Sequence, residues 1–525
     1  MPPATSAGRR AGVLMPLFSL RSRSGWGLGE IPDLEAFSAW AADAGFSVVQ
    51  LLPVNEPSHG QSSPYGALTA FALDPAYLSL ERVADFQAAG GLAALSPGDA
   101  DAVRALAAAP AVDWNRLRPL KDRALAVAWR HFAERVLPSG GARAEAFAAF
   151  AARHAHWLDD YALFVALKAA HGGRAWWEWE PALAHRDPAA LAAARDTHSQ
   201  SLRFHTYVQW LLDEQWLAAR RAAEARGVSL MGDLPFVVAG DSADVWSRPG
   251  DFRLDAEVGV PPDAFSADGQ AWGLPVYRWD AMERGGFEWM RRRAERSGEL
   301  FGLYRVDHVV GLYRTYFIEH GLRRGAGDPK AFVPEGEHAQ TRLGEAVITL
   351  LKGGPAGSRV IAEDLGTVPD FVRRSLTRLG VPGYRVLRWE KDLHAFRDPA
   401  RWPALSVATT GTHDTESLAE WHDALPAHEL AALRQVPGLE SLPDRFDDRA
   451  RDIYLACIYA AGSELLLVPF QDALGHRERV NVPGTVNSDN WTYRMPMALD
   501  ALCADDASQT RLADLARRTG RLHSR

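Results

Sequence analysis

The chain has 525 residues, of which 47% are hydrophobic and 24% charged, and its formal net charge is −8 at pH 7. This is globular composition with enough apolar sequence for a sizeable core, and the negative balance argues against a nucleic-acid partner. The two cysteines, Cys457 and Cys503, exclude a disulfide framework and indicate a reducing compartment. Because no run approaches the ~20 apolar residues of a membrane span, we expect a cytoplasmic protein with no membrane partner.

Eight short apolar runs, each ending in polar residues, predict the strands of a parallel sheet, because strands covered on both faces are apolar throughout. These runs occupy residues 12–20, 46–54, 228–236, 303–309, 359–366, 383–389, 406–414 and 464–472. Helical patterns separate them, and the clearest cover residues 33–45, 156–173, 201–227 and 369–380. Eight strand–helix alternations predict an α/β fold, a (β/α)8 TIM barrel.

The chain is longer than the ~250 residues that such a barrel typically needs, so the surplus must be insertions. We predict a catalytic barrel from residues 1–54 and 228–525, with active-site loops that include 250–275. Residues 55–227 read as a large, mainly helical insertion between the second and third strands. Because only about fifty residues follow the last predicted strand, we expect no separate C-terminal β-domain.

Four carboxylates stand at the carboxyl ends of predicted strands, where barrels of this type carry their chemistry. They are Asp233, Asp307, Glu363 and Asp414. Any one of them could be a helix cap or a solvated loop residue, but four at matched positions favour a site. A retaining glycosyl transfer needs one carboxylate as nucleophile and a second carboxyl group ~5–5.5 Å away as acid and base.

The basic and polar neighbours of these carboxylates predict different environments for them. Arg305 lies two residues before Asp307, so both side chains should share one strand face. The arginine would favour the ionised form that a nucleophile requires, although a structural ion pair closing the barrel explains the pattern equally well. Glu363 has no cation adjacent in sequence and is the better candidate for a raised pKa. Asp414, after His413, suits hydrogen bonding to a distorted sugar ring.

Two other kinds of site are less favoured by the sequence. The segment 25–30, GWGLGE, imitates a dinucleotide-binding loop, but its glycine spacing does not match that motif. A catalytic metal is also disfavoured, since neighbours on a strand point to opposite faces. Each of the pairs Asp307-His308, Glu363-Asp364 and His413-Asp414 therefore offers at most one ligand to a shared centre.

Aromatic residues in three segments raise the same question of sugar platform against local packing. Tyr65 lies in the segment after the second strand, and Phe265 and Trp272 lie in the Pro/Gly-rich segment 258–273, which we expect to be a long loop. For these rings the two readings are about equally supported. The segment 174–180, RAWWEWE, is interpreted as a packed corner of the insertion.

With these residues assembled, the chain resembles the amylomaltases, also called 4-α-glucanotransferases or disproportionating enzymes. The resemblance runs nearly end to end. The motifs that carry it include GVLMPLFSL, SSPYGALTAFALDP, GDLPFVVAGDSADVW, GVPPDAFSADGQAWGLPVYRWD, YRVDH, VIAEDLGTV, GTHDTE and RVNVPGTVNSDNWTYR.

The resemblance implies a retaining double displacement on α-1,4-glucans. It assigns the nucleophile to Asp307, the acid/base to Glu363 and transition-state stabilisation to Asp414. Arg305 and His413 would support the first sugar. The full set of implied substrate-binding residues is Tyr65, Asp263, Phe265, Gln270, Trp272, Arg305, His413, Asn481 and Arg494.

The implied partners are donor and acceptor saccharides such as maltooligosaccharides, amylose and glucose, and the family needs no metal or organic cofactor. The chain departs from the usual family pattern at Ala264, Val309, Val310 and Tyr493. These changes leave the carboxylates unaltered. They are expected to affect how donor and acceptor glucose units are bound. A glucan hydrolase with the same carboxylates, or a non-catalytic glucan-binding barrel, stays open as an alternative.

Overall fold

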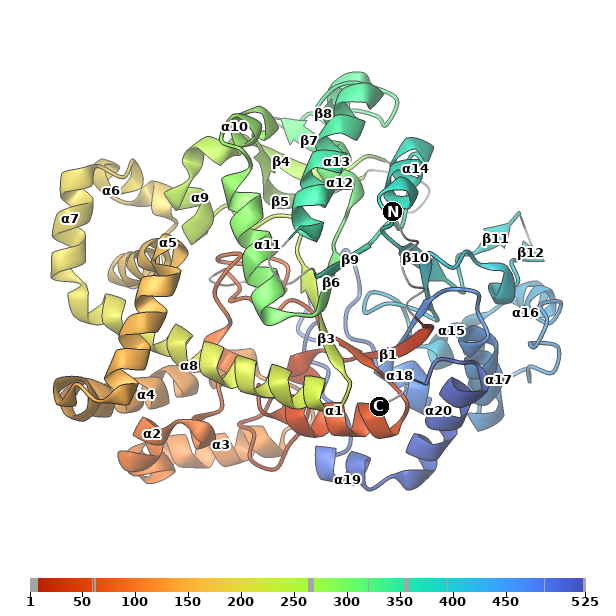
Figure 1. Cartoon of the computed structure of the whole chain (residues 1–525), viewed down its shortest axis with the longest axis horizontal. Helices are drawn as coiled ribbons and strands as arrows, with labels where there is room; N and C mark the ends of the chain where they lie inside the picture. The colour runs from red at the N-terminus through yellow and green to blue at the C-terminus, as the bar shows by residue number, and fades with distance from the viewer. Residues whose placement is uncertain are drawn as a thin grey trace.

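The computed structural model describes residues 8–58, 60, 63–262, 269–319, 321–353, 358–393, 395–485 and 487–522. At its centre eight parallel strands close into a barrel (Figure 1). In order around the barrel they are β1 (Arg10–Leu14), β14 (Leu465–Pro469), β13 (Ser406–Thr409), β10 (Gly383–Val386), β9 (Arg359–Ala362), β6 (Leu303–Val306), β3 (Ser229–Leu234) and β2 (Val48–Gln50). Each overlaps one of the eight predicted runs, so the predicted (β/α)8 barrel is confirmed.

The barrel strands are mostly apolar because their two faces meet two different apolar environments. One set of side chains fills the barrel interior as a single buried cluster of Val48, Met231, Leu303, Ile361, Tyr384, Val386, Val407, Leu465 and Leu467. Most of the remaining strand side chains belong to the larger cluster between the strands and the surrounding helices. Both faces are therefore dry, which explains why no polar alternation marks these strands in the sequence.

Helices follow the strands around the outside of the barrel. They are α1 (Asp33–Asp43), α11 (Glu288–Leu300), α13 (Glu337–Lys352), α14 (Asp370–Arg378), α15 (Leu418–Ala424), α16 (Ala427–Leu433), α17 (Asp448–Tyr459), α18 (Phe470–Leu474), α19 (Leu499–Cys503) and α20 (Asp506–Arg518). The predicted helices at 33–45 and 369–380 correspond to α1 and α14. After β14, the described residues up to 522 form helices and loops and contain no strand.

The segment between β2 and β3 is mainly helical, as its alanine-rich patterns predict. It contains α2 (Ala84–Ala88), α3 (Pro97–Ala108), α4 (Trp114–His131), α5 (Ala142–Ala170), α6 (Pro181–Ala184), α7 (Pro188–Thr197) and α8 (Ser199–Ala225). Figure 1 shows α4 to α7 on one side of the barrel and α15 to α17 on the other. Helix α8 packs on both α5 of the insertion and α1 of the barrel, so it belongs to the packing of both parts. The exact division at 55–227 stays a prediction.

A second, antiparallel sheet lies beside the barrel mouth and was not predicted. It has the order β5 (Gln270–Tyr277), β4 (Phe252–Val260), β7 (Thr315–Glu319) and β8 (Phe332–Val333). The expectation of a long loop over 258–273 is therefore wrong for those of its residues that lie in β4 and β5. Glycine marks irregularities within these strands, at the register shift between Val258 and Gly259 and at Gly273, whose φ is +65°.

The remaining α-helices and strands are short: α9 (Ala243–Ser247), α10 (Trp279–Arg284), α12 (Val310–Tyr313), and the hairpin strands β11 (Lys391–Asp392) and β12 (Ala395–Phe396). Short 3-10 helices and one π-helical segment, Phe132–Val136, join these elements. No helix among the described residues is both long and apolar enough to cross a membrane.

The close approach of β1 to its neighbours predicts a stability effect at Gly12. A Cβ at this position would lie 2.7 Å from the Leu467 Cδ2 atom and 2.8 Å from the Val48 carbonyl oxygen, so strand backbone would have to move. We expect Gly12→Ala to lower the free energy of unfolding by about 1–3 kcal/mol. Chemical denaturation measures this. The control is Gly250→Ala, where no atom lies within 4 Å of the added carbon; equal stability of the two variants would contradict the packing argument.

Candidate active site

Three carboxylates meet at the end of the barrel where β3, β6 and β9 finish. Asp233 is the penultimate residue of β3, and Asp307 and Glu363 directly follow β6 and β9. The backbone ladder continues just past the strand ends: the Asp307 N–H donates to the Leu234 carbonyl, and the Glu363 N–H donates to the Val306 carbonyl, each at 3.0 Å. These hydrogen bonds fix the backbone positions from which the Asp307 and Glu363 side chains extend.

Arg305 joins these three carboxylates. Its Nη1 donates to both oxygens of Asp233, at 2.7 and 2.9 Å, and Asp233 is its direct neighbour in the β3–β6 register. Its Nη2 lies 2.8 Å from Asp307 Oδ1 and 3.8 Å from Glu363 Oε2. The prediction that Arg305 and Asp307 share a face is confirmed. The guanidinium also ties neighbouring strands together, so the structural ion pair and the ion pair with Asp307 coexist.

Glu363 is held in a largely buried position by two backbone donors. The N–H of His308 donates to Oε2 at 2.9 Å, and the N–H of Leu365 donates to Oε1 at 2.8 Å. Burial raises the pKa of Glu363 to about 7, and the charge of Asp307 acts in the same direction, whereas Arg305 and the two N–H groups oppose it. The prediction that Glu363 carries a raised pKa is confirmed.

His308 links the carboxylates to the antiparallel sheet. Its φ of +46° is unusual for a residue with a side chain and accompanies the N–H contact with Glu363. Its ring packs edge-to-face against Trp272 of β5, with centroids 4.8 Å apart. Burial lowers the pKa of His308 to about 4, so the ring is neutral at physiological pH. The Trp272 Nε1 donates to Gln270 Oε1 at 3.1 Å, which places both predicted residues beside the site.

A second set of contacts connects Asp233 with Asp414. The Tyr65 hydroxyl donates to Asp233 Oδ2 at 2.8 Å and lies 2.9 Å from His413 Nε2. His413 Nε2 is 3.3 Å from Asp414 Oδ2, and Asn481 Nδ2 donates to Asp414 Oδ1 at 2.6 Å. The Asp414 side chain remains 41% exposed, unlike the buried His413. The three predicted catalytic carboxylates and four of the predicted binding residues therefore form one connected cluster.

Tyr65 has a ring contact that bears on its predicted role as a sugar platform. Its ring stacks on His413 with centroids 5.5 Å apart and planes 16° apart, so His413 covers one face of the ring. Trp491 packs against both rings at a tilt. Trp491 was not singled out by the sequence analysis, although it stands in the NWTYR motif that carries the resemblance.

The structure places Arg494 in a different setting from the other predicted residues. It is only 4% exposed, and its Nη1 donates to the carbonyl oxygens of Leu106, Ala107 and Ala109 at the end of α3. These contacts fasten the closing segment to the insertion and give its predicted role in sugar binding no support. Asp263 and Phe265, with the departure at Ala264, lie outside the described residues.

Of the other departures from the family pattern, Val309 and Tyr493 are buried and Val310 is partly buried. Val309 has no exposed surface, and its N–H donates to the Glu363 carbonyl oxygen at 3.2 Å. Val310 begins the short helix α12. Tyr493 is 6% exposed, and its hydroxyl has no hydrogen-bond partner among the described residues. The Val309 contact thus concerns the support of Glu363 and not an exposed binding surface.

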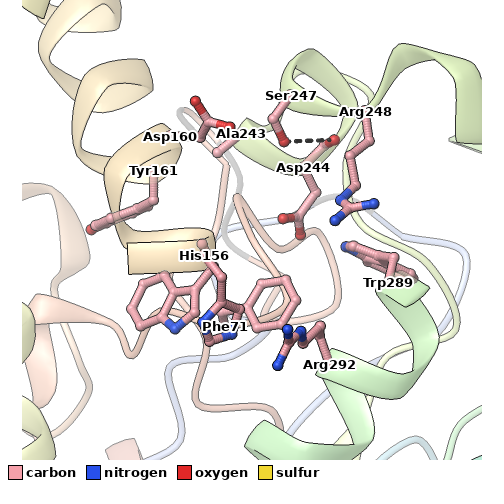
Figure 2. Close-up of a pocket in the computed structure, with 11 residues that line it drawn as sticks. Phe71, His156, Asp160, Tyr161, Ala243, Asp244, Ser247, Arg248, Trp289 and Arg292 are labelled. Carbon is pink, nitrogen blue, oxygen red and sulfur yellow. Dashed lines mark hydrogen bonds between the residues drawn. The ribbon is translucent and has the colours of Figure 1, made fainter. Parts of the chain in front are cut away.

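A separate cavity of about 220 Å³ lies where the insertion meets the barrel (Figure 2). Its lining comes from the segment after β2 and from α5, α9 and α11, and includes Phe71, Trp157, Asp244 and Trp289. Asp244 accepts a hydrogen bond from the Ala70 N–H at 2.7 Å, so it helps to hold the segment after β2. None of the predicted site residues that the structure describes lines this cavity.

Comparison of this chain with known proteins identifies the family to which it belongs. The profile of the 4-alpha-glucanotransferase family matches residues 15–500. A 4-alpha-glucanotransferase from Thermus thermophilus is 35% identical over 505 residues, which cover 93% of this chain and 95% of that protein. The chain belongs to the 4-alpha-glucanotransferase family. The resemblance and the enzyme class predicted from the motifs are thereby confirmed.

Further relatives agree with this family assignment. A 4-alpha-glucanotransferase from Synechocystis is 31% identical over 519 residues, which cover 93% of this chain and 94% of that protein. The solved structure of an amylomaltase from Streptococcus agalactiae in complex with acarbose matches with a TM-score of 0.83 and 25% identity. The match covers 98% of this chain and all of that chain. Family membership supports action on α-1,4-glucans, and the roles of single residues stay predictions.

The raised pKa of Glu363 predicts a pH-dependent stability. A carboxyl whose pKa rises from 4.5 to about 7 on folding stabilises the fold fully below pH 4.5 and loses that contribution as the pH rises through 7. The loss is about 3 kcal/mol. Because Glu363→Gln does not titrate, its stability relative to wild type should increase by that order between pH 4.5 and 8, as measured by chemical denaturation.

A control of opposite sign is Glu283→Gln, at an exposed residue whose pKa is lowered by its hydrogen bond with Arg342. Its stability relative to wild type should not rise with pH. A difference between Glu363→Gln and wild type that stays constant across this range would show that the carboxyl is not desolvated in the folded protein.

Proposed function

We propose that this protein transfers segments of α-1,4-glucan between saccharides by a retaining double displacement. In the first step an Asp307 oxygen attacks C1 of the donor glucosyl unit while Glu363 protonates the departing glycosidic oxygen. In the second step the 4-hydroxyl of an acceptor glucan loses its proton to Glu363 and attacks C1, which releases Asp307. The new bond has the α configuration of the original, and glucose or a short maltooligosaccharide is released from the donor.

The observation that carries this proposal is that one guanidinium nitrogen of Arg305 lies close to an oxygen of both carboxylates, Asp307 and Glu363. Arg305 Nη2 lies 2.8 Å from Asp307 Oδ1 and 3.8 Å from Glu363 Oε2, so these oxygens are no more than about 6.6 Å apart. This limit includes the ~5–5.5 Å separation of retaining enzymes and excludes most of the ~6.5–9.5 Å range of inverting ones. The geometry thus favours a covalent intermediate on Asp307.

The environments of the two carboxylates support their different roles. Asp307 forms a direct ion pair with Arg305, which orients the carboxylate that attacks. Glu363 has a pKa of about 7, so near neutral pH it can both give and take a proton. Asp414 accepts a hydrogen bond from Asn481 and is partly exposed, which leaves it able to accept hydrogen bonds from sugar hydroxyls.

The residues around this cluster suit the binding of glucose units. Arg305, His413 and Tyr65 would bind the first sugar, and Gln270 and Trp272 of β5 would flank the acceptor side. Trp272 is partly buried against the neutral His308 ring, and a tryptophan face is a suitable surface for the apolar side of a sugar. Retention of the acceptor there would favour attack by a sugar hydroxyl over attack by water.

Incubation with maltotriose tests transfer against hydrolysis. A transferase is expected to release glucose and build longer maltooligosaccharides while the total number of reducing ends stays constant, because each bond broken is replaced by a new one. Chromatography of the products and a reducing-end assay, run on the same samples, measure both quantities. Reducing ends that rise in proportion to total cleavage would instead identify a hydrolase that uses the same carboxylates.

Replacement of Glu363 tests the acid/base role. Loss of a positioned acid/base is expected to lower kcat/KM for maltotriose by ~10²–10⁴-fold in Glu363→Gln. The wild-type rate should fall above about pH 7, as the proton on Glu363 is lost. The matched control is Glu56→Gln, since the pKa of Glu56 is also raised to about 7 by burial but its carboxylate binds the Tyr161 hydroxyl. An active Glu363→Gln enzyme would remove Glu363 from this role.

A further inference from the structure

The segment that carries Asp414, residues 410–418, runs from the end of β13 to the start of α15, and its two ends are fixed by one buried residue. Asp472 of α18 accepts a hydrogen bond from the Thr410 hydroxyl at 2.5 Å and another from the Leu418 N–H at 2.7 Å. The position of Asp414, in the middle of the segment, is left to other contacts.

Arg479 supplies the contact to the middle of the segment. Its Nη2 donates to the carbonyl oxygen of Asp414 at 3.1 Å and to the carbonyl oxygen of Asn481 at 3.3 Å. The side chains of the same two residues also meet, because Asn481 Nδ2 donates to Asp414 Oδ1 at 2.6 Å. One guanidinium nitrogen therefore aligns the two backbone positions from which the paired side chains extend.

Arg479 is itself held from the barrel side through Glu416. The Arg479 Nη1 donates to Glu416 Oε1 at 3.3 Å, and Arg388 Nη1 donates to Glu416 Oε2 at 3.1 Å. Arg388 is buried two residues after β10, where its Nε donates to the Thr410 carbonyl at 3.2 Å and its guanidinium lies over the Trp421 ring. A connected path of contacts thus leads from the end of β10 to Arg479.

The kinds of atom that Arg479 contacts indicate how it acts. The ion pair recorded for it among the described residues is with Glu416, and on Asp414 it binds the backbone carbonyl and not the carboxylate. It therefore acts on the position of Asp414 and not as its counter-ion. The contacts use both terminal nitrogens in two directions, which the planar fork of arginine allows and the single ammonium of lysine does not.

We infer that Arg479 is a positioning residue for the reaction, which sets the Asp414 carboxylate by aligning the backbones of Asp414 and Asn481. The inference rests on the proposed function, in which Asp414 stabilises the transition state. Because an interaction made mainly in the transition state contributes to kcat, misplacement of Asp414 should lower kcat and leave KM almost unchanged.

Steady-state kinetics on maltotriose, with rates per folded protein from circular dichroism, test this role. Arg479→Gln is expected to lower kcat about 10- to 100-fold, the cost of a small misplacement at a reacting centre, with KM within about threefold of wild type. Arg479→Lys should fall between the two, since it can bind only part of the same set. Unchanged kcat in Arg479→Gln, or a loss confined to KM, would overturn the inference.

The matched control is Arg434→Gln. Arg434 is also a partly exposed arginine, and its guanidinium donates to a backbone carbonyl, that of Leu442, and to a carboxylate, that of Asp444. None of these partners belongs to the carboxylate cluster, so kcat of Arg434→Gln should stay within about twofold of wild type. A loss of kcat as large as that of Arg479→Gln would indicate a general structural effect and would overturn the positioning role.

A double-mutant cycle with Asn481→Ala separates positioning from an independent effect on the fold. In the Asn481→Ala background the contact that Arg479 aligns is already lost, so the factor by which Arg479→Gln lowers kcat should shrink at least about threefold. Equal factors in the two backgrounds would show that Arg479 does not act through this contact, which would overturn the inference.

Failure of the proposed function has a different outcome. A wild type that does not cleave maltotriose, or an Asp414→Asn variant as active as wild type, would refute the proposed function and this inference together. Full activity of Arg479→Gln beside an inactive Asp414→Asn would overturn the inference alone. Because kcat is measured as total cleavage, a hydrolase that uses the same carboxylates would give the same test of Arg479.

Discussion

The mouth of the barrel is organised by the Arg305 guanidinium, which pairs Asp233 with one terminal nitrogen and Asp307 with the other. Carboxylates brought this close would repel one another without a shared cation, and a largely buried arginine would be unstable without acids around it. Breaking such a buried pair costs about 3–5 kcal/mol, since a charge is left without compensation. The β3–β6 register sets Asp233 beside Arg305, so the electrostatics of the site follow from how the barrel closes.

The same arrangement gives the two carboxylates proposed for chemistry different surroundings. Asp307 is in direct contact with the arginine, whereas Glu363 is farther from it, more buried and bound by two backbone N–H groups. Burial outweighs these favourable contacts, and the pKa of Glu363 is about 7 as a result. The left-handed backbone of His308 is part of this balance, because its N–H is one of the two donors and its ring meets Trp272.

Local patterns in the sequence were sufficient to predict the barrel. Each strand lies in a largely apolar run because both of its faces are covered, and that signal needs no knowledge of its neighbours. The antiparallel sheet escaped prediction because its strands are partly exposed and interrupted by glycine and proline, as at Gly273. These residues read as a loop, although here they produce irregularities within β4 and β5.

The sequence alone determined where the candidate catalytic residues lie along the chain: acids at strand ends, Arg305 two residues before Asp307, and the motifs of the family. It could not determine which groups meet across the barrel. The tertiary structure decided that Arg305 binds Asp233 as well as Asp307, and that Tyr65 and Asn481 complete the path to Asp414. It also decided that the Arg494 side chain donates to backbone carbonyls at the end of α3 and that Trp177 faces solvent. Periodicity is a local property of the chain, whereas ion pairs and burial depend on strand register and helix packing between distant segments.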